Sequence, residues 1–457
     1  MDYSSEKKIK IFFTVTNDLN GDRRMIRICT SLESVGYDVT LIGRKLRNST
    51  ALIQQPFRQQ RMYLFFTKGK LFYIEYNIHL FFKLFFSSFD IICGIDLDSI
   101  LPCYFAARLK GKKKLVYDAH ELFTDTPEVY KRKTIRKIWL MVEKFIIPKT
   151  DLRYTVSQSI ADEFENRYGF KFELIRNLPS IDNKRWTIDD GNTKNIDFLK
   201  SKIQNPKSKI VYLGNLNEGR GVEIAIEALK FLNDDVHLWI IGDGNLRPVL
   251  EAQVGISRDL SGHQLSERVK FFGFIPPNQL PVILSQAKIG LHVLESKGLS
   301  YEYSLANKFF DYIQAGLPSV FTNLKEHKQL NDTYNIGIMI ENADAKETAD
   351  AVNLLLNDKK LYQTLHENCL KAATILCWEN EEKELVRLYE QLSAITLLPP
   401  AEKKMFDHPT NQQNDQLTKN DFYIENGLYV FTEAFLLKRG YCCGNGCRHC
   451  PYQKMND

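Results

Sequence analysis

Residues 304–318, which read S-L-A-N-K-F-F-D-Y-I-Q-A-G-L-P, combine an amine and a carboxylate at helical spacing. A helical period places Asn307, Lys308 and Asp311 on one polar face, opposite an apolar face. Near the N-terminus of a helix, the amine can bind a phosphate and the carboxylate can bind a diol. A solvated Lys–Asp pair explains the same pattern about equally well. The rest of the chain has to decide between these two interpretations.

Glycines and one arginine follow the strands that we predict in the second half of the chain. The predicted strand 210–213 runs into G-N-L-N-E-G-R-G, and the predicted strand 236–241 runs into G-D-G. Backbone amides next to glycine can face a diphosphate without side-chain obstruction, and an arginine can bridge two phosphate oxygens. We therefore expect a diphosphate site that includes Gly214, Arg220, Gly242 and Gly244.

Two predicted strands of the first half end in titratable residues: D-L-D, with Asp96 and Asp98, and D-A-H-E, with Asp118, His120 and Glu121. Polar groups at strand ends are typical of the lip of a binding site. His120 could donate to a substrate hydroxyl or share charge near neutral pH, although a helix-capping or core histidine is the alternative. Asp96 and Asp98 could bind a divalent cation, but we favour structural or acceptor-side roles for all four carboxylates.

The C-terminal tail concentrates four of the nine cysteines, Cys442, Cys443, Cys447 and Cys450, close to His449. Such density favours a zinc or iron–sulfur site, and a reduced, partly buried knot is the alternative. The other cysteines are scattered, and the N-terminus has no apolar signal segment. We therefore expect a cytoplasmic protein without a disulfide framework.

Composition limits the possible partners. A chain of 457 residues predicts about three domains, and an apolar fraction of 44% suffices for large cores. The net charge of +5 is too small for nucleic acid to be the main partner. Residues 64–93 are the most apolar region, but charged residues interrupt it too often for a membrane span.

Two segments, 58–83 and 131–147, mix basic and aromatic residues. In the second segment, Ile135, Ile138, Trp139 and Val142 share one helical face beneath lysines and arginines. Cationic amphipathic segments often lie on anionic membrane surfaces. Core packing with a solvated basic face is nearly as good an explanation, so peripheral membrane contact is a hypothesis.

Both halves repeat the strand–loop–helix–strand order of a doubly wound parallel sheet. The first begins with a strand at 8–15, a loop at 17–24 and a helix. The inward face of that helix is predicted as Ile26, Cys29, Leu32 and Val35. A polar linker at 184–208 separates the halves.

The order of these motifs resembles that of family 4-type glycosyltransferases with the GT-B fold, over residues about 8 to 395. The matching motifs are L-V-Y-D-A-H-E, G-R-G, N-K-F-F-D-Y-I-Q-A-G-L-P and a closing helix near Trp378. The resemblance implies an α/β protein in which two Rossmann-like domains face a cleft. The tail resembles small cysteine-rich bacterial domains of unknown function. The expected parts are an acceptor domain at 1–185, a nucleotide-sugar domain at 186–376, a closing helix at 377–395, a linker at 396–419 and a cysteine-rich module at 420–457.

The resemblance also implies roles for single residues. Asp311 would bind the ribose hydroxyls, Arg220 and Lys308 the diphosphate, and His120 the donor sugar or the reaction centre. Gly273 to Ile275 would contact the base, and the Asn20–Gly21 loop would face the transferred sugar, although Gly21 alone is equally consistent with a simple turn. The expected donor-binding set is Asn20, Gly21, Gly214, Arg220, Gly242, Gly244, Gly273, Ile275, Asn307, Lys308 and Asp311.

The chain departs from the family pattern at two places. Many members carry a glutamate where this chain has Tyr303, so Glu295 is the candidate second catalytic residue beside His120, with Glu302, or neither glutamate, as the alternatives. Many also carry a lysine a few residues after the arginine of G-R-G, where this chain reads V-E-I-A-I-E, so Lys308 is the candidate for that charge.

The resemblance implies transfer of a sugar from a UDP- or GDP-linked donor to a glycan or lipid-linked acceptor. It further implies retention of the anomeric configuration, no requirement for a metal, and a role in cell-surface polysaccharide synthesis at the inner face of the membrane. A nucleotide-sugar epimerase and a non-catalytic nucleotide-sugar-binding scaffold with a metal-binding tail are the alternatives.

Overall fold

The computed structural model describes residues 8–47, 49–111, 113–181, 208–259, 262–276, 279–296, 298–397, 422–425 and 428–433. The chain divides into two compact units, Met1–Leu397 and Leu398–Asp457. Nearly all of the two predicted linkers, and the four clustered cysteines of the tail, lie outside the described residues.

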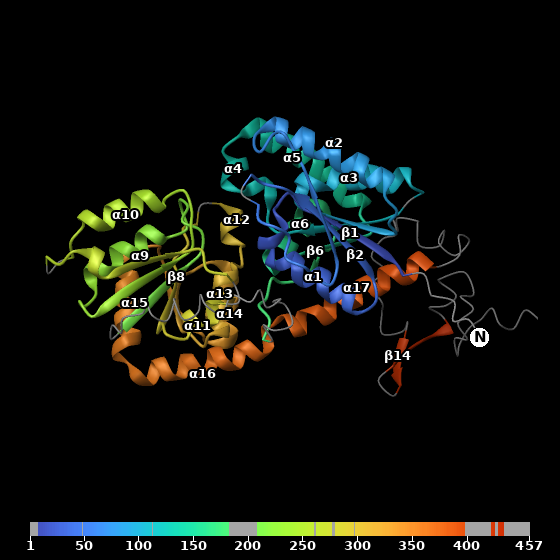
Figure 1. Ribbon diagram of the computed structural model, residues 1–457. Helices are drawn as coiled ribbons and strands as arrows, with labels where there is room; N and C mark the ends of the chain where they lie inside the picture. The colour runs from blue at the N-terminus through green and yellow to red at the C-terminus, as the bar shows by residue number, and fades with distance from the viewer. Residues whose placement is uncertain are drawn as a thin grey trace, which may run out of the picture. The chain divides into compact units, whose positions relative to one another are not determined.

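A seven-stranded parallel sheet forms the first half of the larger unit, with the strand order β3-β2-β1-β4-β5-β6-β7 (Figure 1). Its strands are β1 (Lys10–Thr14), β2 (Asp38–Arg44), β3 (Arg58–Met62), β4 (Ile91–Ile95), β5 (Lys114–Ala119), β6 (Leu152–Thr155) and β7 (Glu173–Leu174). Chain order reverses between β1 and β4. Such a switch point opens a crevice at the carboxyl ends of the strands, where ligands bind in doubly wound sheets.

Helices cover both faces of this sheet (Figure 1). On one face lie α2 (Lys70–Phe86), α3 (Asp96–Leu109), α5 (Lys133–Ile146) and α6 (Gln158–Tyr168), and on the other lie α1 (Arg23–Ser34) and α17 (Trp378–Leu397). The predicted inward face of α1 is wrong at one end. Val35 is 48% exposed because the helix ends at Ser34, and Met25 and Ile28 occupy the buried positions instead.

A six-stranded parallel sheet forms the second half, with the order β10-β9-β8-β11-β12-β13. Its strands are β8 (Ser208–Leu213), β9 (Val236–Ile241), β10 (Val269–Gly273), β11 (Ile289–His292), β12 (Ser319–Thr322) and β13 (Gly337–Ile340). Its helices are α9 (Val222–Ala228), α10 (Arg247–Ile256), α11 (Leu280–Leu284), α12 (Leu299–Glu302), α13 (Asn307–Gln314), α14 (Lys325–Tyr334), α15 (Ala345–Asn357) and α16 (Lys359–Ile375). The predicted architecture of two doubly wound, Rossmann-like domains is confirmed.

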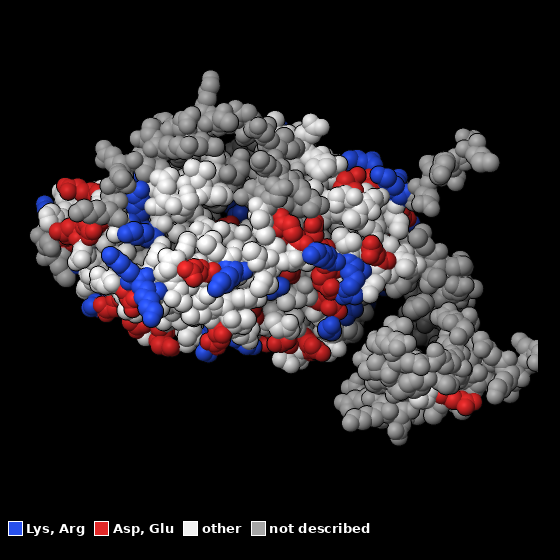
Figure 2. Space-filling view, turned by 90° about the horizontal axis from the view of Figure 1, so that it is seen from below, with Lys and Arg blue, Asp and Glu red and all other residues white. Residues whose placement is uncertain are grey.

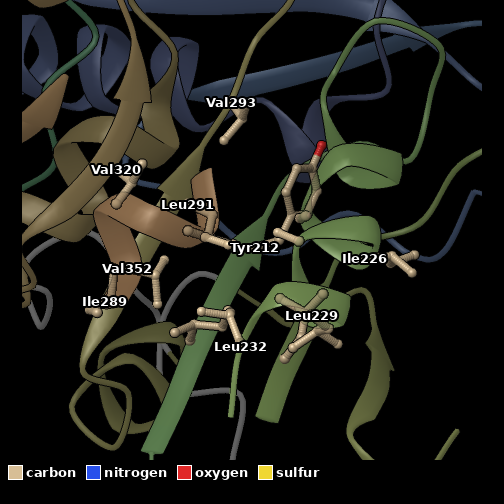
Figure 3. Packing of buried hydrophobic residues seen from close by; sticks show 14 of the residues in the cluster. Tyr212, Ile226, Leu229, Leu232, Ile289, Leu291, Val293, Val320 and Val352 are labelled. Carbon is tan, nitrogen blue, oxygen red and sulfur yellow. The ribbon is translucent and has the colours of Figure 1, made fainter. Parts of the chain in front are cut away.

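The core of the second domain explains how its site is held. Ile289, Leu291 and Val320 pack with Tyr212 between the sheet and the helices (Figure 3). Because β8 is buried along its whole length, its last residues are fixed at the carboxyl edge of the sheet. The predicted apolar face of α13 also packs inward, since Phe309, Tyr312 and Ile313 are at most 1% exposed.

The last helix, α17, returns to the first domain. Its Trp378 is fully buried there and donates from Nε1 to Ser31 Oγ at 2.9 Å. Tyr389 lies in the same core, with its hydroxyl 3.3 Å from that of Tyr154. Helix α17 therefore fastens the end of the second domain to the core of the first.

The described part of the smaller unit is an antiparallel hairpin of β14 (Phe422–Glu425) and β15 (Leu428–Phe431). Among the described residues of the whole chain, no helix is both long and apolar enough to cross a membrane.

Candidate active site

A cleft of about 460 Å³ lies at the carboxyl ends of both sheets. Residues that follow β5 and residues of α1 form its wall in the first domain. The loops after β8, β9 and β10 and the first turns of α13 form its wall in the second. The lining residues that the sequence analysis singled out are His120, Gly214, Arg220, Gly242, Ile275, Asn307, Lys308 and Asp311.

Lys308 offers an unpaired amine to this cleft. Its side chain is 8% exposed, and its Nζ lies 4.1 Å from the centroid of the Tyr212 ring. No acceptor among the described residues forms a hydrogen bond with that Nζ. Burial and the neighbouring Arg220 lower the pKa of Lys308 to about 7, because both disfavour the charged form. An anion in the cleft would supply the missing acceptor.

Arg220 lies in the loop between β8 and α9, and its guanidinium is 4.7 Å from the centroid of the Tyr301 ring. Its Nε is buried and lacks a hydrogen-bond partner among the described residues. The loop can hold this position only with glycine at 221, since a Cβ there would be 1.5 Å from the Val293 carbonyl oxygen. Arg220 and Lys308 thus leave two hydrogen-bonding nitrogens available to a phosphate.

Asp311 binds an arginine of the opposite domain. Arg23 Nη2 lies 3.1 Å from Asp311 Oδ1, and Arg23 Nη1 lies 3.2 Å from Oδ2. Nearby, Asn177 Nδ2 donates to Asn307 Oδ1 at 2.7 Å, which also joins the two domains. A diol that binds Asp311 therefore has to share or displace the Arg23 guanidinium.

His120 is held by two neighbours below the cleft. Its Nε2 lies 3.0 Å from Asp118 Oδ2 and 3.0 Å from Arg24 Nε, so this nitrogen either donates to Asp118 or accepts from Arg24. Burial opposes charge on His120, but Asp118 and Asp96 raise its pKa to about 9. The raised pKa favours the protonated imidazolium, which donates from Nε2 to Asp118.

Three of the four predicted acceptor-side carboxylates, Asp96, Asp98 and Asp118, are less exposed than His120. Asp118 is fully buried, and despite that burial Arg24 and His120 hold its pKa below the usual value. Asp98 accepts from Thr16 Oγ1 at 2.8 Å, and burial raises its pKa to about 6. Burial raises the pKa of Asp96 to about 8, and its Oδ1 accepts from the His120 amide at 2.8 Å. Asp96 and Asp118 thus hold His120 in place, and Asp98 binds the neighbouring Thr16.

Several other predicted site residues lie off the cleft. The Asn20 amide donates to Thr50 Oγ1 and the Ala51 carbonyl, so it holds a neighbouring loop. The Glu295 backbone amide donates to the Gly219 carbonyl at 3.2 Å. The predicted residues that do not line the cleft are Asn20, Gly21, Gly244, Gly273, Glu295, Asp96, Asp98, Asp118 and Glu121.

Tyr303, at the position where the family often has glutamate, packs against the core of the first domain. Its carbonyl accepts from Ser157 Oγ at 2.7 Å. The neighbouring Glu302 lines a second cavity of about 530 Å³, together with Tyr130, Arg136 and Arg167. Position 303 therefore makes a contact between the domains. Neither of the two candidate glutamates, Glu295 and Glu302, lines the main cleft.

Arg23 and Arg24, in the first turn of α1, line the cleft but were not predicted from the sequence. Cations are unfavourable at a helix N-terminus, so two adjacent arginines there were a signal of a role outside the helix. The other missed lining residues with polar or aromatic side chains are Asn177, Tyr212, Asn215 and Asp243.

Comparison with protein families matches both domains. Residues 21–180 match the model described as Glycosyltransferase Family 4, and residues 207–358 match that of Glycosyl transferases group 1. The chain belongs to the family 4-type GT-B glycosyltransferases. Residues 412–456 of this glycosyltransferase match a family of unknown function, DUF5522.

Curated relatives are distant. The glycosyltransferase is 24% identical over 229 residues to alpha-D-kanosaminyltransferase of Streptomyces kanamyceticus, covering 50% of this chain and 56% of that one. It is 24% identical over 293 residues to D-inositol 3-phosphate glycosyltransferase of Corynebacterium urealyticum, covering 60% and 63% of the two chains. The chain thus spans less than two thirds of the length of these relatives.

Solved structures share the fold. Sucrose-phosphate synthase from Thermosynechococcus elongatus superposes with a TM-score of 0.68 at 17% identity, covering 85% of this glycosyltransferase and 100% of that chain. Anabaena HepE, in complex with UDP and glucose, gives a TM-score of 0.64 at 16% identity, covering 84% and 100%.

Proposed function

We propose that this protein is a hexosyltransferase that moves a sugar from a nucleoside diphosphate donor to a glycan or lipid-linked acceptor. The observation that carries the proposal is the pair of available cations, Arg220 and Lys308, at the carboxyl edge of the second sheet. Buried nitrogens without an acceptor are costly, so a site that keeps two of them suits an anion with several oxygens. A diphosphate has that chemistry, and a solved structure of similar fold holds UDP.

The other parts of a nucleotide fit around this pair. Asp311 would accept hydrogen bonds from the ribose hydroxyls once Arg23 turns toward the diphosphate. Phe274 and Ile275 line the cleft on the side of β10 and would cover the base, which we propose to be uracil or guanine. The exposed ring of Phe274 offers a stacking surface.

The protonation of His120 supports a mechanism that retains the anomeric configuration. An imidazolium cannot take a proton from the acceptor, so the departing diphosphate is the base nearest to the reaction. The bond from the anomeric carbon to the diphosphate oxygen breaks, the acceptor oxygen bonds to that carbon, and the hydroxyl proton passes to the diphosphate. Acceptor and leaving group then share one side of the sugar. His120 would donate to a sugar hydroxyl, and Arg220 and Lys308 would stabilise the leaving charge without a metal.

The acceptor would enter over the first domain. Of the four carboxylates that we assigned to the acceptor side, Glu121 is the one that we retain for direct contact, since Asp98 and Asp118 are buried. Glu121 itself does not line the cleft, and the charge of Arg220 opposes the rise in its pKa that burial causes. We place the reaction in cell-surface polysaccharide synthesis at the cytoplasmic face of a membrane.

The test is release of nucleoside diphosphate from a panel of UDP-, GDP-, ADP- and CMP-linked sugars, with and without extracts of membrane glycolipid. One donor should release nucleoside diphosphate only when the extract is present. A chelator should leave the amount released unchanged. Donor binding without release under any condition would favour a non-catalytic scaffold. Interconversion of the donor sugar would favour an epimerase, and no binding of any donor would refute the proposal.

The role of the tail cysteines remains a prediction, because Cys442, Cys443, Cys447 and Cys450 lie outside the described residues. Elemental analysis of the purified chain should find one zinc per chain, or the two or four irons of an iron–sulfur cluster.

A further inference from the structure

Helix α2 is apolar on two opposite faces. Its inner face packs into the core of the first domain through Phe72, Tyr76, Leu80 and Leu84. Its outer face presents Leu71, Ile74, Ile78, Phe82 and Phe85, each 38% to 56% exposed. A helix that is apolar all round is typical of one covered on both sides. Within the described chain, nothing covers the outer face of α2.

The exposed apolar surface continues across the neighbouring helices. Helix α3 contacts both α2 and α5, so the three helices form one layer over the sheet (Figure 1). On α5, Ile138, Met141 and Phe145 are 40% to 56% exposed and recur at helical spacing. The rings of Phe145 on α5 and Tyr104 on α3 lie 5.3 Å apart. We call the exposed apolar side chains of α2 and α5 the apolar platform.

Cationic side chains lie directly on the aromatic rings of this layer. Lys149 Nζ is 3.8 Å from the centroid of Phe145, and Lys110 Nζ is 5.7 Å from that of Phe85. On α5, Lys137 and Lys144 are exposed one turn to either side of Met141. Lysines beside exposed aromatic rings are the arrangement found in helices that lie at a lipid headgroup layer.

Acidic side chains do not offset this charge. On α2 the acidic residue is Glu75, which accepts from the amides of Phe65 and Phe66 at 2.7 and 2.8 Å and stays charged, but Lys70 and Lys83 on the same helix outnumber it. On α5 it is Glu143, which is buried. By contrast, the face seen in Figure 2, on the far side of the molecule from α2 and α5, mixes basic and acidic residues. Positive charge and exposed apolar surface therefore coincide on one layer of helices.

We propose that the apolar platform docks on an anionic lipid bilayer, with Phe82, Ile78 and Met141 inserted among the headgroups and Lys137 and Lys144 paired with phosphates. The proposal rests on the proposed function, for which it supplies the surface that meets a membrane-borne acceptor. A lipid surface fits better than a protein partner, because lysines flank the exposed apolar side chains. In a bilayer the phosphate groups likewise lie close to the ends of the acyl chains, so both kinds of side chain would find a partner.

The test is sedimentation of the full chain with vesicles of phosphatidylglycerol and phosphatidylcholine, measured without any donor. The protein should bind these vesicles, bind pure phosphatidylcholine far less, and dissociate as salt rises. Lys137→Gln with Lys144→Gln should weaken binding about 25-fold, at roughly fivefold for each charge. Ile78→Ser with Phe82→Ser should weaken it at least as much, and neither change should lower the unfolding temperature, since all four side chains point outward.

Matched controls use the same side-chain types in the second domain. Val249 and Ile256 on α10 are 62% and 85% exposed, and Lys359 and Lys360 on α16 are exposed as well. Changing these pairs to serine and glutamine should leave vesicle binding unchanged. The proposal would be overturned if the control variants lost as much vesicle binding as the platform variants, or if the wild type did not bind anionic vesicles.

Two further results would assign the platform to another occupant and also overturn it. One is self-association in lipid-free solution, measured by light scattering, that the Ile78→Ser and Phe82→Ser changes abolish. The other is vesicle binding that begins only after deletion of residues 398–457. Vesicle binding is measured without donor, so a failure of donor turnover does not affect this test. Likewise, a failure of vesicle binding does not affect the test of donor binding and turnover.

Discussion

Donor affinity should depend on pH through Lys308. Its ammonium has a pKa of about 7 in the free protein, because burial and Arg220 disfavour the charge. A bound diphosphate supplies an opposite charge and should return the pKa toward 10 or above. Binding the donor then requires the charged form of Lys308 and takes up a proton whenever the pH exceeds about 7.

The magnitude follows from the fraction of free protein that carries the charge. That fraction is about 0.9 at pH 6 and about 0.01 at pH 9 for a pKa near 7, so affinity should fall nearly 100-fold across this range. The loss equals about 2.7 kcal/mol at about 1.36 kcal/mol per tenfold change. A nucleotide sugar is the right ligand, since its two phosphates keep a fixed charge over this range.

Calorimetric titration of the donor in two buffers of different ionisation enthalpy measures both the affinity and the proton uptake. Lys308→Met should bind weakly at every pH with a flatter profile, and Lys308→Arg should lose most of the pH dependence because an arginine stays charged. Lys325→Met, an exposed lysine that does not line the cleft, is the matched control and should behave as the wild type. Equal pH profiles for the wild type and Lys308→Met would refute this reasoning.

Four further outcomes are expected. Arg23→Gln should raise the affinity for a free nucleoside about fivefold by equilibrium dialysis, because the competing ion pair is partly exposed and worth about 1 kcal/mol; weaker binding would contradict competition. Arg24→Met should cost about 3–5 kcal/mol in urea unfolding, since the fully buried Asp118 carboxylate loses the arginine that binds both of its oxygens and keeps only His120 as a partner; a cost below about 1 kcal/mol would contradict it. Trp378→Ala should cost about 3–5 kcal/mol as α17 loses its anchor, and a neutral result would mean that α17 is held elsewhere. Deleting residues 398–457 should leave donor affinity unchanged; its loss would place the tail in the site.

Local patterns were enough to predict the scaffold. Continuous apolar runs predicted the central strands, and glycine after β8 and β9 marked the edge where the cleft lies. The helical period of residues 304–318 placed Lys308 and Asp311 on the polar side of α13, where the structure also has them. These features depend on chain geometry over a few residues, which the sequence displays directly.

Contacts between distant segments were beyond such patterns. The pairing of Arg23 with Asp311 depends on how the two domains face each other, over 288 positions of sequence. The sequence showed that Tyr303 stands where many family members have a glutamate, but it did not show that Tyr303 packs on the first domain. Asn20 was wrongly expected to lie on the cleft, because nothing local shows that residues 50–53 bind its side chain. In each case tertiary packing decides where a polar loop residue points.

The central claim is that the cleft binds a nucleoside diphosphate through Arg220, Lys308 and Asp311. The most direct measurement is calorimetric titration of UDP and GDP, with UMP, GMP and orthophosphate as comparisons, into the wild type, Asp311→Ala and Arg220→Met. One nucleoside diphosphate should bind at one site per chain, far more tightly than its monophosphate or orthophosphate, and each substitution should weaken it strongly. Equal binding of diphosphate and monophosphate, or unchanged affinity in Asp311→Ala and Arg220→Met, would contradict the claim.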